Sequence, residues 1–308
     1  MSKESKAWLY LITLSVIWGS SFILMKRGMF TTPGQPIFSD VEVASLRMVI
    51  AGSVLLPFAF RSMSKLKDIK TFLFLCVVGL CGNFFPAYLF TYAETGVSSG
   101  LAGMMNSFTP IFALTIGFFV FKERLNKLQS LGVVIGVVGV VLLMISGKNF
   151  EVKGEWSHIF AIVGATFCYA ISVNTIKYKL PHLRSIELAA LAFSVILLPS
   201  LLIGLKSGVI ETIKTNEFAL EGLFYITILS VIGTAMALII FNKMISISSV
   251  LFATSVTYLI PIVAVVIGLY FGEQIGWIQI IAMGIVLLGV FIANYLGKKQ
   301  VVSKKNTH

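Results

Sequence analysis

The sequence predicts an all-α integral membrane protein with ten transmembrane helices. They form two inverted five-helix repeats, with the N- and C-termini in the cytoplasm. Three observations support this prediction. The chain of 308 residues is 57% hydrophobic and only 12% charged, whereas a soluble domain carries about 25% charge. Its Lys and Arg residues are distributed unequally between alternate loops, and one phrase of the sequence appears twice.

So few charged residues cannot cover the surface of a folded chain, so most of that surface must face lipid. A net charge of +11 would fit nucleic-acid binding in a soluble protein, but here its distribution explains it. Cys76, Cys81 and Cys168 lie in apolar runs without a CxxC or Cys/His pattern. We interpret them as small buried residues, and we expect no metal site and no cofactor.

Crossing the hydrocarbon core takes about 20 apolar residues. The predicted spans are residues 7–27, 41–60, 71–92, 98–121, 128–146, 157–176, 186–205, 221–242, 249–271 and 275–296. The first apolar run is long for a signal peptide and no small-residue cleavage site follows it, so we expect a retained helix. The predicted domains are a first repeat over 1–147, a second over 156–297 and a short basic cytoplasmic tail over 298–308.

The positive charges predict the orientation of these spans. Of the 24 Lys and Arg residues, 17 lie on the side of the two termini and six on the other side, while Arg47 lies inside the second span. Loops rich in Lys and Arg stay in the cytoplasm. The charge is therefore an orientation signal, and no nucleic-acid partner is needed to explain it.

The phrase FKERLNKLQSLG at 121–132 recurs as FGEQIGWIQIIA at 271–282, and PIFALTIG at 110–117 recurs as PIVAVVIG at 261–268. Chance resemblance of two amphipathic connectors is the alternative, but many registers agree. The copies are five spans apart, and five is odd, so the second copy enters the membrane in the opposite sense and faces outside. The second copy lacks the cations of FKERLNKLQSLG, as expected for a loop outside the cytoplasm. An inverted repeat is typical of secondary transporters that bind substrate near mid-membrane.

Three segments carry a family resemblance: TLSVIWGSSF in the first span, YAETGVSSGLAGMMNSFTPIF across the third and fourth, and FKERLNKLQSLGVVIGVVGVVLL into the fifth. With its two five-helix repeats, the chain resembles the EamA-type transporters of the drug/metabolite transporter superfamily over nearly its whole length. The resemblance implies a ten-helix, multi-pass carrier of the cell (inner) membrane, often an exporter of amino acids or related metabolites. It does not name the substrate.

Polar and aromatic side chains recur at helical spacing inside the spans, which is what a cavity for an amphipathic ligand requires. The predicted cavity residues are Trp18, Ser21, Asn83, Tyr88, Tyr92, Asn106, Tyr169, Ser172, Thr254, Thr257 and Tyr258. For any single residue, two structural roles are as well supported as a place in the cavity: an aromatic ring at the membrane interface, or a hydroxyl hydrogen bond between helices.

Three prolines lie within predicted spans and are expected to kink them, because proline removes one helical hydrogen bond. Pro110 and Pro261 occupy matching positions, and each frees a carbonyl beside a polar side chain, at Asn106 and Thr257. Pro86 does the same in the third span. The freed carbonyls would line a polar cavity, and kinks that only improve packing are the alternative.

Three cations lie near the predicted mouths of the bundle. Lys26 and Lys177 end the first and sixth spans and would attract anionic groups, although such lysines more often reach toward lipid headgroups. Arg47 lies deepest and needs a partner, for which Glu42 and Glu94 are candidates.

No acidic residue falls in the middle of a predicted span, which makes a proton-coupled exporter of cations less expected than a carrier of neutral or zwitterionic molecules. No phosphate-binding loop or catalytic motif occurs, so neither ATP drive nor an enzyme is predicted. The predicted function is a secondary exporter of small metabolites such as amino acids, working by alternating access. Its partners are the substrate and the bilayer, and a homodimer is left open. The alternative is a non-transporting protein, either a structural subunit or a lipid-handling or membrane-embedded enzyme.

Overall fold

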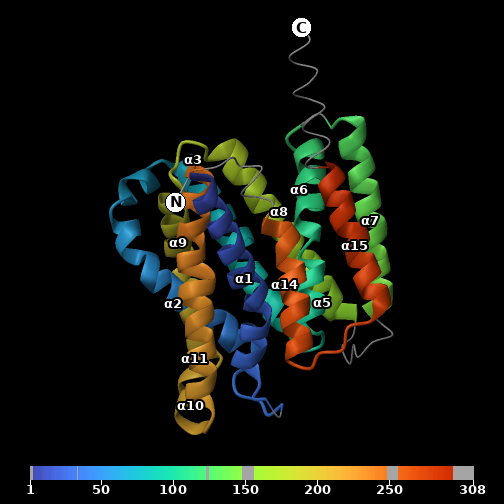
Figure 1. Cartoon of the computed structure of the whole chain (residues 1–308). Coiled ribbons are helices and arrows are strands. Elements are labelled where there is room, and N and C mark those ends of the chain that lie inside the picture. Colours follow the sequence, from blue (N-terminus) through green and yellow to red (C-terminus); the bar gives the residue numbers. More distant parts are fainter. Residues whose placement is uncertain (1–2, 33, 123–124, 148–155, 248–255, 294–308) are drawn as a thin grey trace.

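The computed structural model describes residues 3–32, 34–122, 125–147, 156–247 and 256–293. In these ranges the chain forms a bundle of helices (Figure 1). The first half contains α1 (Lys3–Met29), α2 (Asp40–Phe60), α3 (Ile69–Gly79), α4 (Phe85–Glu94), α5 (Ser99–Met105), α6 (Phe108–Phe119) and α7 (Lys127–Gly147). The second half contains α8 (Trp156–Lys179), α9 (Ser185–Lys206), α10 (Val209–Thr215), α11 (Ala219–Ser230), α12 (Ala237–Ile247), α14 (Val256–Tyr270) and α15 (Trp277–Phe291).

Seven helical stretches are long and apolar enough to cross a membrane: Glu4–Met29, Asp40–Phe60, Ile69–Glu94, Ser99–Phe119, Trp156–Lys179, Ser185–Lys206 and Ala219–Phe241. Three shorter helical stretches are also apolar: Lys127–Leu143, Val256–Tyr270 and Trp277–Phe291. The predicted span 249–271 begins in residues that lie outside the described ranges. The prediction of an all-helical membrane protein is confirmed.

Side-chain caps set where several helices begin. The Ser39 hydroxyl accepts from the Glu42 N–H, and the Glu42 carboxylate accepts from the Ser39 N–H at 2.8 Å, a capping box at the start of α2. Asp68 caps α3 by accepting from the N–H and the hydroxyl of Thr71. These hydrogen bonds, with that from the Thr71 hydroxyl the largest cause, hold the pKa of Asp68 below its ordinary value. The caps therefore lie in the short connectors, as helix ends within a bundle require.

Three of the predicted spans are not regular helices. The third and eighth contain π-helical segments, η2 (Leu80–Phe84) and η3 (Val231–Met236), and the fourth breaks between α5 and α6. The two π-helical segments start 151 residues apart, the offset that also relates Lys26 to Lys177. Pro86 follows η2, but Ala237 takes its place after η3, so proline cannot be the common cause. Single π-turns are often found at functional sites.

Helix packing follows the internal repeat. The most extensive helix packing joins α2 to α9 and α7 to α15. In each pair the two helices occupy equivalent positions in the two halves. The contact of α4 with α8 has its equivalent in that of α1 with α11 and α12. The contact of α6 with α8 likewise matches that of α14 with α1. The two halves are therefore joined by pairs of equivalent contacts, with α1 and α8 central in both sets.

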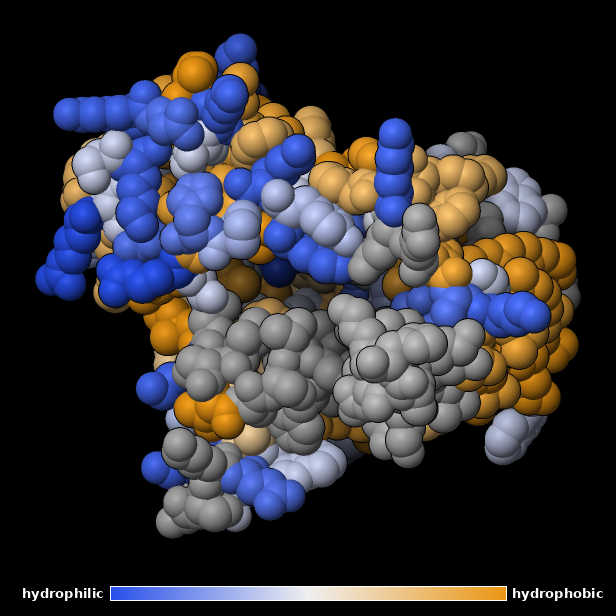
Figure 2. Space-filling view, turned by 90° about the horizontal axis from the view of Figure 1, so that it is seen from above, coloured by the Kyte–Doolittle hydropathy of each residue, from blue (hydrophilic) through white to orange (hydrophobic). Residues whose placement is uncertain are grey.

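Large apolar side chains are exposed on the flanks of the bundle, among them Phe119, Tyr270 and Trp277, each at least 74% exposed. Figure 2, which views the top of the bundle in Figure 1, shows hydrophilic residues gathered on this end face and hydrophobic residues along its side. An apolar belt below a polar end is what a lipid environment requires.

Candidate functional site

The repeated phrase places a residue with left-handed backbone shortly after a helix in both halves. Gly272 ends α14 in the left-handed region at φ 82°, and its counterpart Lys122 follows α6 at φ 55°. After Gly272, the Glu273 N–H donates to the Gly268 carbonyl at 2.9 Å, which closes a Schellman motif. This hydrogen bond directs Glu273 back toward the bundle. A lysine in the left-handed region costs backbone energy, so the first repeat keeps this backbone conformation at Lys122 although the residue is not glycine.

The other repeated residues have structural roles at the next helix. The Gln129 side chain accepts from the Asn126 N–H at 2.9 Å, and the Gln279 side chain accepts from the Gly276 N–H at 3.0 Å. Both glutamines are buried, at 8% and 2% exposure. They cap α7 and α15, so the recurrence of glutamine reflects helix capping.

The repeated phenylalanines contact opposite halves. The Arg27 guanidinium lies 5.0 Å from the centre of the Phe271 ring, and Tyr178 stacks on Phe121 at 4.5 Å. Arg27 and Tyr178 are themselves equivalent, one residue after Lys26 and Lys177. Each phrase therefore packs against the central helix of the other half, α8 for the first copy and α1 for the second.

Glu273 binds two elements of the first half. Its carboxylate accepts from the Lys26 ammonium at 3.3 Å and from the Ser99 and Gly100 N–H groups at 2.8 Å each. A Cβ at Gly268 would lie 2.5 Å from this carboxylate, so glycine leaves it the space to reach the start of α5. One carboxylate thus ties the connection between α14 and α15 to α1 and α5.

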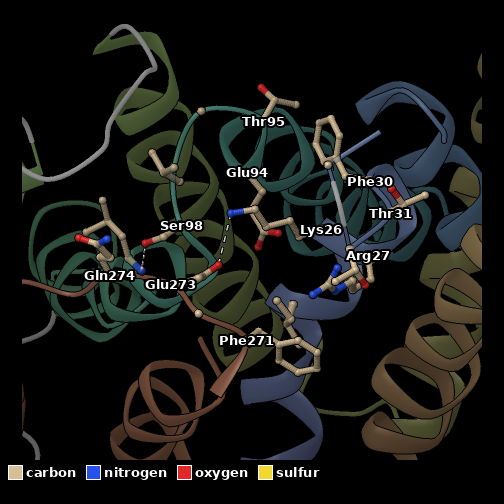
Figure 3. Close-up of a pocket in the computed structure, with 17 residues that line it drawn as sticks. Lys26, Arg27, Phe30, Thr31, Glu94, Thr95, Ser98, Phe271, Glu273 and Gln274 are labelled. Atoms are coloured by element: carbon tan, nitrogen blue, oxygen red, sulfur yellow. Dashed lines mark hydrogen bonds and ion pairs between the residues drawn. The ribbon is translucent and has the colours of Figure 1, made fainter. Parts of the chain in front are cut away.

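Lys26 and Glu273 line a cavity of about 450 Å³ (Figure 3), which we call the charged vestibule. Its charged residues are Lys26 and Arg27 from α1, Glu94 at the end of α4, and Glu273. Thr31 and Ser98 add hydroxyl groups to its wall. Both halves of the chain therefore contribute to one small cavity with charges of both signs.

Glu94 is a vestibule residue that is absent from the predicted cavity set and was expected only as a candidate partner of Arg47. It ends α4 and is 1% exposed. Among the described residues, neither carboxylate oxygen has a hydrogen-bond partner. Figure 3 shows the carboxylate beside the Lys26 side chain. The neighbouring sequence contains no pattern that signals this burial, which comes from the packing of α4 against α1, α2 and α8.

None of the predicted cavity residues that the structure describes lines the vestibule, and several of them lie at helix interfaces instead. Trp18 packs on Phe241 of α12 at 5.4 Å between ring centres, and Ser21 is buried with its hydroxyl donating to the Ile17 carbonyl. Tyr169 lies 6.0 Å from Phe90. These contacts place the three residues on α1 and α8, the central helices of the two halves.

Further predicted residues gather around η2. Asn83 lies in this π-helical segment, and the Ser172 hydroxyl lies against Gly82, where a Cβ would overlap it. The Tyr88 and Ser45 hydroxyls are 2.8 Å apart, which joins α4 to α2. The Tyr92 hydroxyl donates to Ser157 at 3.0 Å. Tyr88 and Tyr92 thus make hydrogen bonds between helices, which is the alternative to a role in a substrate cavity.

The remaining predicted cavity residues lie on the fourth and ninth spans. Asn106 caps the end of α5, at the break before α6. In α14, Thr257 is half-buried, and the Tyr258 hydroxyl donates to the Val290 carbonyl of α15 at 3.1 Å. Thr254 lies outside the described residues. Neither the vestibule nor the cavity beside Gln35 and Asn216 has any of the described ones in its wall.

Comparison with known proteins decides the family. The profile of the EamA-like transporter family matches residues 5–145 and again residues 156–295. The chain belongs to the EamA-like transporter family. This EamA-family chain is 28% identical over 293 residues to "Uncharacterized inner membrane transporter YedA" of Escherichia coli strain K12, covering 94% of this chain and 90% of that one. "Protein PagO" of Salmonella typhimurium strain LT2 is 21% identical, with 95% and 93% covered.

A shorter match joins this EamA-family chain to "Probable amino-acid metabolite efflux pump" of Salmonella typhimurium strain LT2, 27% identical over 143 residues, 45% of this chain and 44% of that one. A solved crystal structure superimposes with a TM-score of 0.58 at 16% identity, covering 96% of this chain and 99% of that one. That likeness shows the fold alone. The predictions of an EamA-type chain and of a multi-pass inner-membrane transporter are confirmed.

The matching prolines of this EamA-family chain differ in structure. Pro110 lies in the first turn of α6, after the helix break, and the Asn106 carbonyl accepts from the Thr109 N–H at 3.2 Å, so it is not left free. Pro261 is buried inside α14, which continues through it. The equivalent sequence positions therefore do not form equivalent kinks.

The deep cation of this EamA-family chain has neither of its expected hydrogen-bond partners. Arg47 donates to the Thr234 hydroxyl of η3 at 3.2 Å and contacts the Met25 sulfur at 3.5 Å. Glu42 is instead bonded within its own capping box, and Glu94 interacts with Arg47 by charge alone. Lys177 lies over the Tyr178 ring at 4.7 Å. Arg47 thus links α2 to the π-helical segment of the second half.

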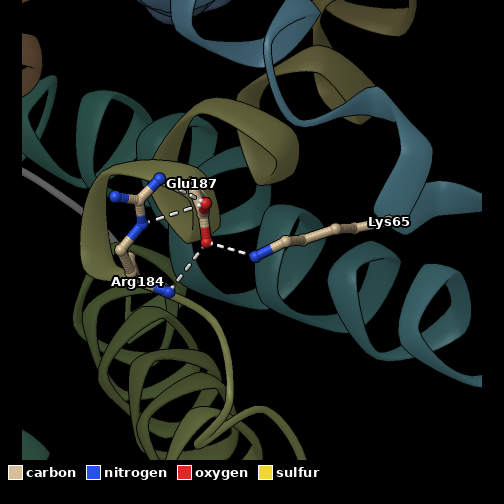
Figure 4. A network of polar contacts seen from close by, with 3 residues as sticks. All are labelled: Lys65, Arg184 and Glu187. Carbon is tan, nitrogen blue, oxygen red and sulfur yellow. Dashed lines mark hydrogen bonds and ion pairs between the residues drawn. The ribbon is translucent and has the colours of Figure 1, made fainter.

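A second charged network lies outside the vestibule (Figure 4). Glu187, at the start of α9, accepts from Lys65 at 2.5 Å and from the Arg184 guanidinium at 2.8 Å. The carboxylate side chain is 7% exposed, whereas Arg184 is 80% exposed. The network ties the connector before α3 to the start of α9.

Replacing Glu187 with glutamine is expected to lower the free energy of unfolding by about 2 kcal/mol, because it removes the charged acceptor of both cations. Thermal unfolding of the detergent-purified protein measures the change. Arg184→Gln is the matched control and is expected to cost under about 1 kcal/mol, since its side chain is mostly in water. Equal losses in the two variants would contradict the assignment of Glu187 as the centre of the network.

Proposed function

We propose that the chain is a secondary exporter of small metabolites such as amino acids or related zwitterions. It would have ten spans in two inverted repeats, with both termini in the cytoplasm, and work by alternating access. The observation that carries the proposal is the charged vestibule, which both halves line and which presents cations and carboxylates within about 450 Å³.

The chemistry of the vestibule favours a zwitterion. Lys26 and Arg27 can attract a carboxylate, and Glu273 can attract an ammonium group. The name of the Salmonella typhimurium relative, a probable amino-acid metabolite efflux pump, supports the same substrate class. Partners would be this small molecule and the bilayer, with no role for nucleic acid, and a homodimer stays open.

Alternating access requires contacts that join the halves on one side of the membrane at a time. The Lys26–Glu273 pair is such a contact, and it lies at the ends of spans predicted to face outside. The Phe121–Tyr178 stack is its counterpart at the ends of spans predicted to face the cytoplasm. Trp18, Asn106 and Tyr169 are our candidates for the path between them.

Efflux from cells that overproduce the chain tests the function. Cells are loaded with a panel of amino acids and dipeptides, and external substrate is measured over time. Faster efflux of one class is expected, reduced by at least about tenfold in Lys26→Met, since losing one charged hydrogen bond costs about 1.5–3 kcal/mol.

Trp18→Ala and Asn106→Ala are measured beside Lys26→Met, with membrane levels matched. Loss of efflux in all three variants would place the path from the vestibule to mid-membrane. Efflux that survives in Trp18→Ala and Asn106→Ala would exclude that path. The proposal that the chain is a transporter would still stand. A chain that accelerates efflux of no compound in the panel would contradict the proposed substrate class.

A further inference from the structure

Three glutamates are buried in the described residues, at 4% exposure for Glu42, 1% for Glu94 and 5% for Glu187. Two of them are fully bonded. Glu42 accepts from the Ser39 N–H at 2.8 Å and from the Thr212 hydroxyl at 2.7 Å, and Glu187 has its two cations. Glu94 is the most buried, and it has no hydrogen-bond donor among the described residues.

An ionised carboxylate buried without a donor costs several kcal/mol, so such a group gains either a partner or a proton. Each Glu94 carboxylate oxygen exposes less than 1 Å², which leaves no contact surface for the ammonium group of a metabolite. Glu94 nevertheless belongs to the vestibule wall. A proton needs almost no space and can reach the Glu94 carboxylate from water in the vestibule, so a proton is the ligand that fits this site.

We propose that Glu94 is a proton-binding site that couples export to the proton gradient. The inference rests on the proposed function and names its coupling ion. With Glu94 protonated, Lys26 pairs with Glu273 and joins the two halves, as in this structure. When the proton passes from the Glu94 carboxyl to vestibule water, the carboxylate attracts the neighbouring Lys26 away from Glu273. No other bond is made or broken.

The switch depends on the charges around Glu94. Lys26 of α1 and Arg47 of α2 attract its ionised form, whereas Glu273 repels it. From α8 come Tyr169, which lies against Phe90 of α4, and His158, whose ring nitrogen is 3.2 Å from the Thr95 hydroxyl. From η2 comes the Cys81 thiol, a free thiol that lies beside the free thiol of Cys168. The described residues of α5 include no ionisable side chain. A pH effect that belongs to Glu94 must therefore persist when His158 is replaced by glutamine.

Infrared difference spectroscopy of the whole chain tests proton binding without any substrate. The protein is purified in dodecyl maltoside, which has no carbonyl band, and titrated from about pH 6 to about pH 9, a range in which an exposed glutamate is almost fully ionised. We expect a carbonyl band of a protonated carboxylic acid at neutral pH that disappears as the pH rises. At neutral pH this band is expected to be absent in Glu94→Gln and present in Glu42→Gln and His158→Gln.

A wild-type chain without this band, or a band that persists in Glu94→Gln, would overturn the proposal. Near-ultraviolet circular dichroism shows whether Glu94→Gln retains its tertiary packing. If that variant misfolds, Glu94→Asp replaces it, and a shifted carbonyl band is then expected, whereas an unshifted band would assign the proton elsewhere.

Transport separates this proposal from the function on which it rests. For a compound that the efflux panel identifies, one proton exchanged per molecule changes the steady substrate ratio by about tenfold per pH unit across the membrane. Glu94→Gln is expected to remove this dependence while substrate still equilibrates. Transport whose pH dependence survives in Glu94→Gln would overturn the coupling role alone. A panel without any transported compound would overturn the proposed function, and the infrared band would still decide whether Glu94 binds a proton.

Discussion

Replacing Glu273 with glutamine is expected to lower efflux by at least about tenfold and to destabilise the closed vestibule by roughly 3 kcal/mol. The substitution removes the charge that accepts from Lys26 at 3.3 Å and from the Ser99 and Gly100 N–H groups at 2.8 Å. Hydrogen bonds to a charged group are worth about 1.5–3 kcal/mol each, and glutamine retains part of one. Efflux at matched membrane levels measures the effect.

The matched control is Glu221→Gln, the same chemical change at an exposed position of α11, where no effect is expected. A double-mutant cycle with Lys26→Met sharpens the test. Because the two side chains form one pair, the double variant should be little worse than either single variant. Fully additive losses would show that Lys26 and Glu273 act separately, contrary to their role as a contact between the halves.

Replacing Gly289 with alanine is expected to destabilise the protein by about 1–3 kcal/mol, the cost of overpacking a tight interface. A Cβ there would lie 2.7 Å from both the Gly132 carbonyl oxygen and the Gly136 Cα of α7. These atoms belong to backbone and cannot turn aside as a side chain could. Thermal unfolding of the purified variant, together with its yield in the membrane, measures the loss.

Gly284 is the matched control, because it lies on the same helix and a Cβ there would meet nothing within 4 Å. Gly284→Ala is expected to be neutral or to stabilise by up to about 1 kcal/mol, since alanine favours a helix more than glycine does. If both alanine variants unfold like the wild type, α7 and α15 do not approach as closely as the structure places them.

Gly132 and Gly136 form a GxxxG pattern on α7, and both lie against Gly289 of α15. Small residues at this spacing allow two backbones to meet, and that is a local property of one helix face. The partner helix could not be predicted in the same way. It follows from the way α7 and α15 lie against each other across the repeat.

The π-helical segments η2 and η3 were not predicted. Proline is a visible signal of an irregular helix, and Pro86 follows η2, but η3 has no proline and its Thr234 hydroxyl instead bonds the Leu229 carbonyl and Arg47. Side chains of other helices meet both segments, Arg47 of α2 at Thr234 of η3 and Ser172 of α8 at Gly82 of η2. No window of the local sequence contains those side chains.

By itself, the sequence determined the membrane class, the family and the existence of two repeats, because these depend on apolar length, charge distribution and recurring phrases that are present along the chain. Only the tertiary structure decided that Glu273 joins Lys26 to the start of α5, and that Glu94, at the end of a span, is buried without a hydrogen-bond partner. Burial and pairing of charges depend on which helices meet, and residues 94 and 273 are far apart in sequence. The charged vestibule therefore exists only once the two halves pack together.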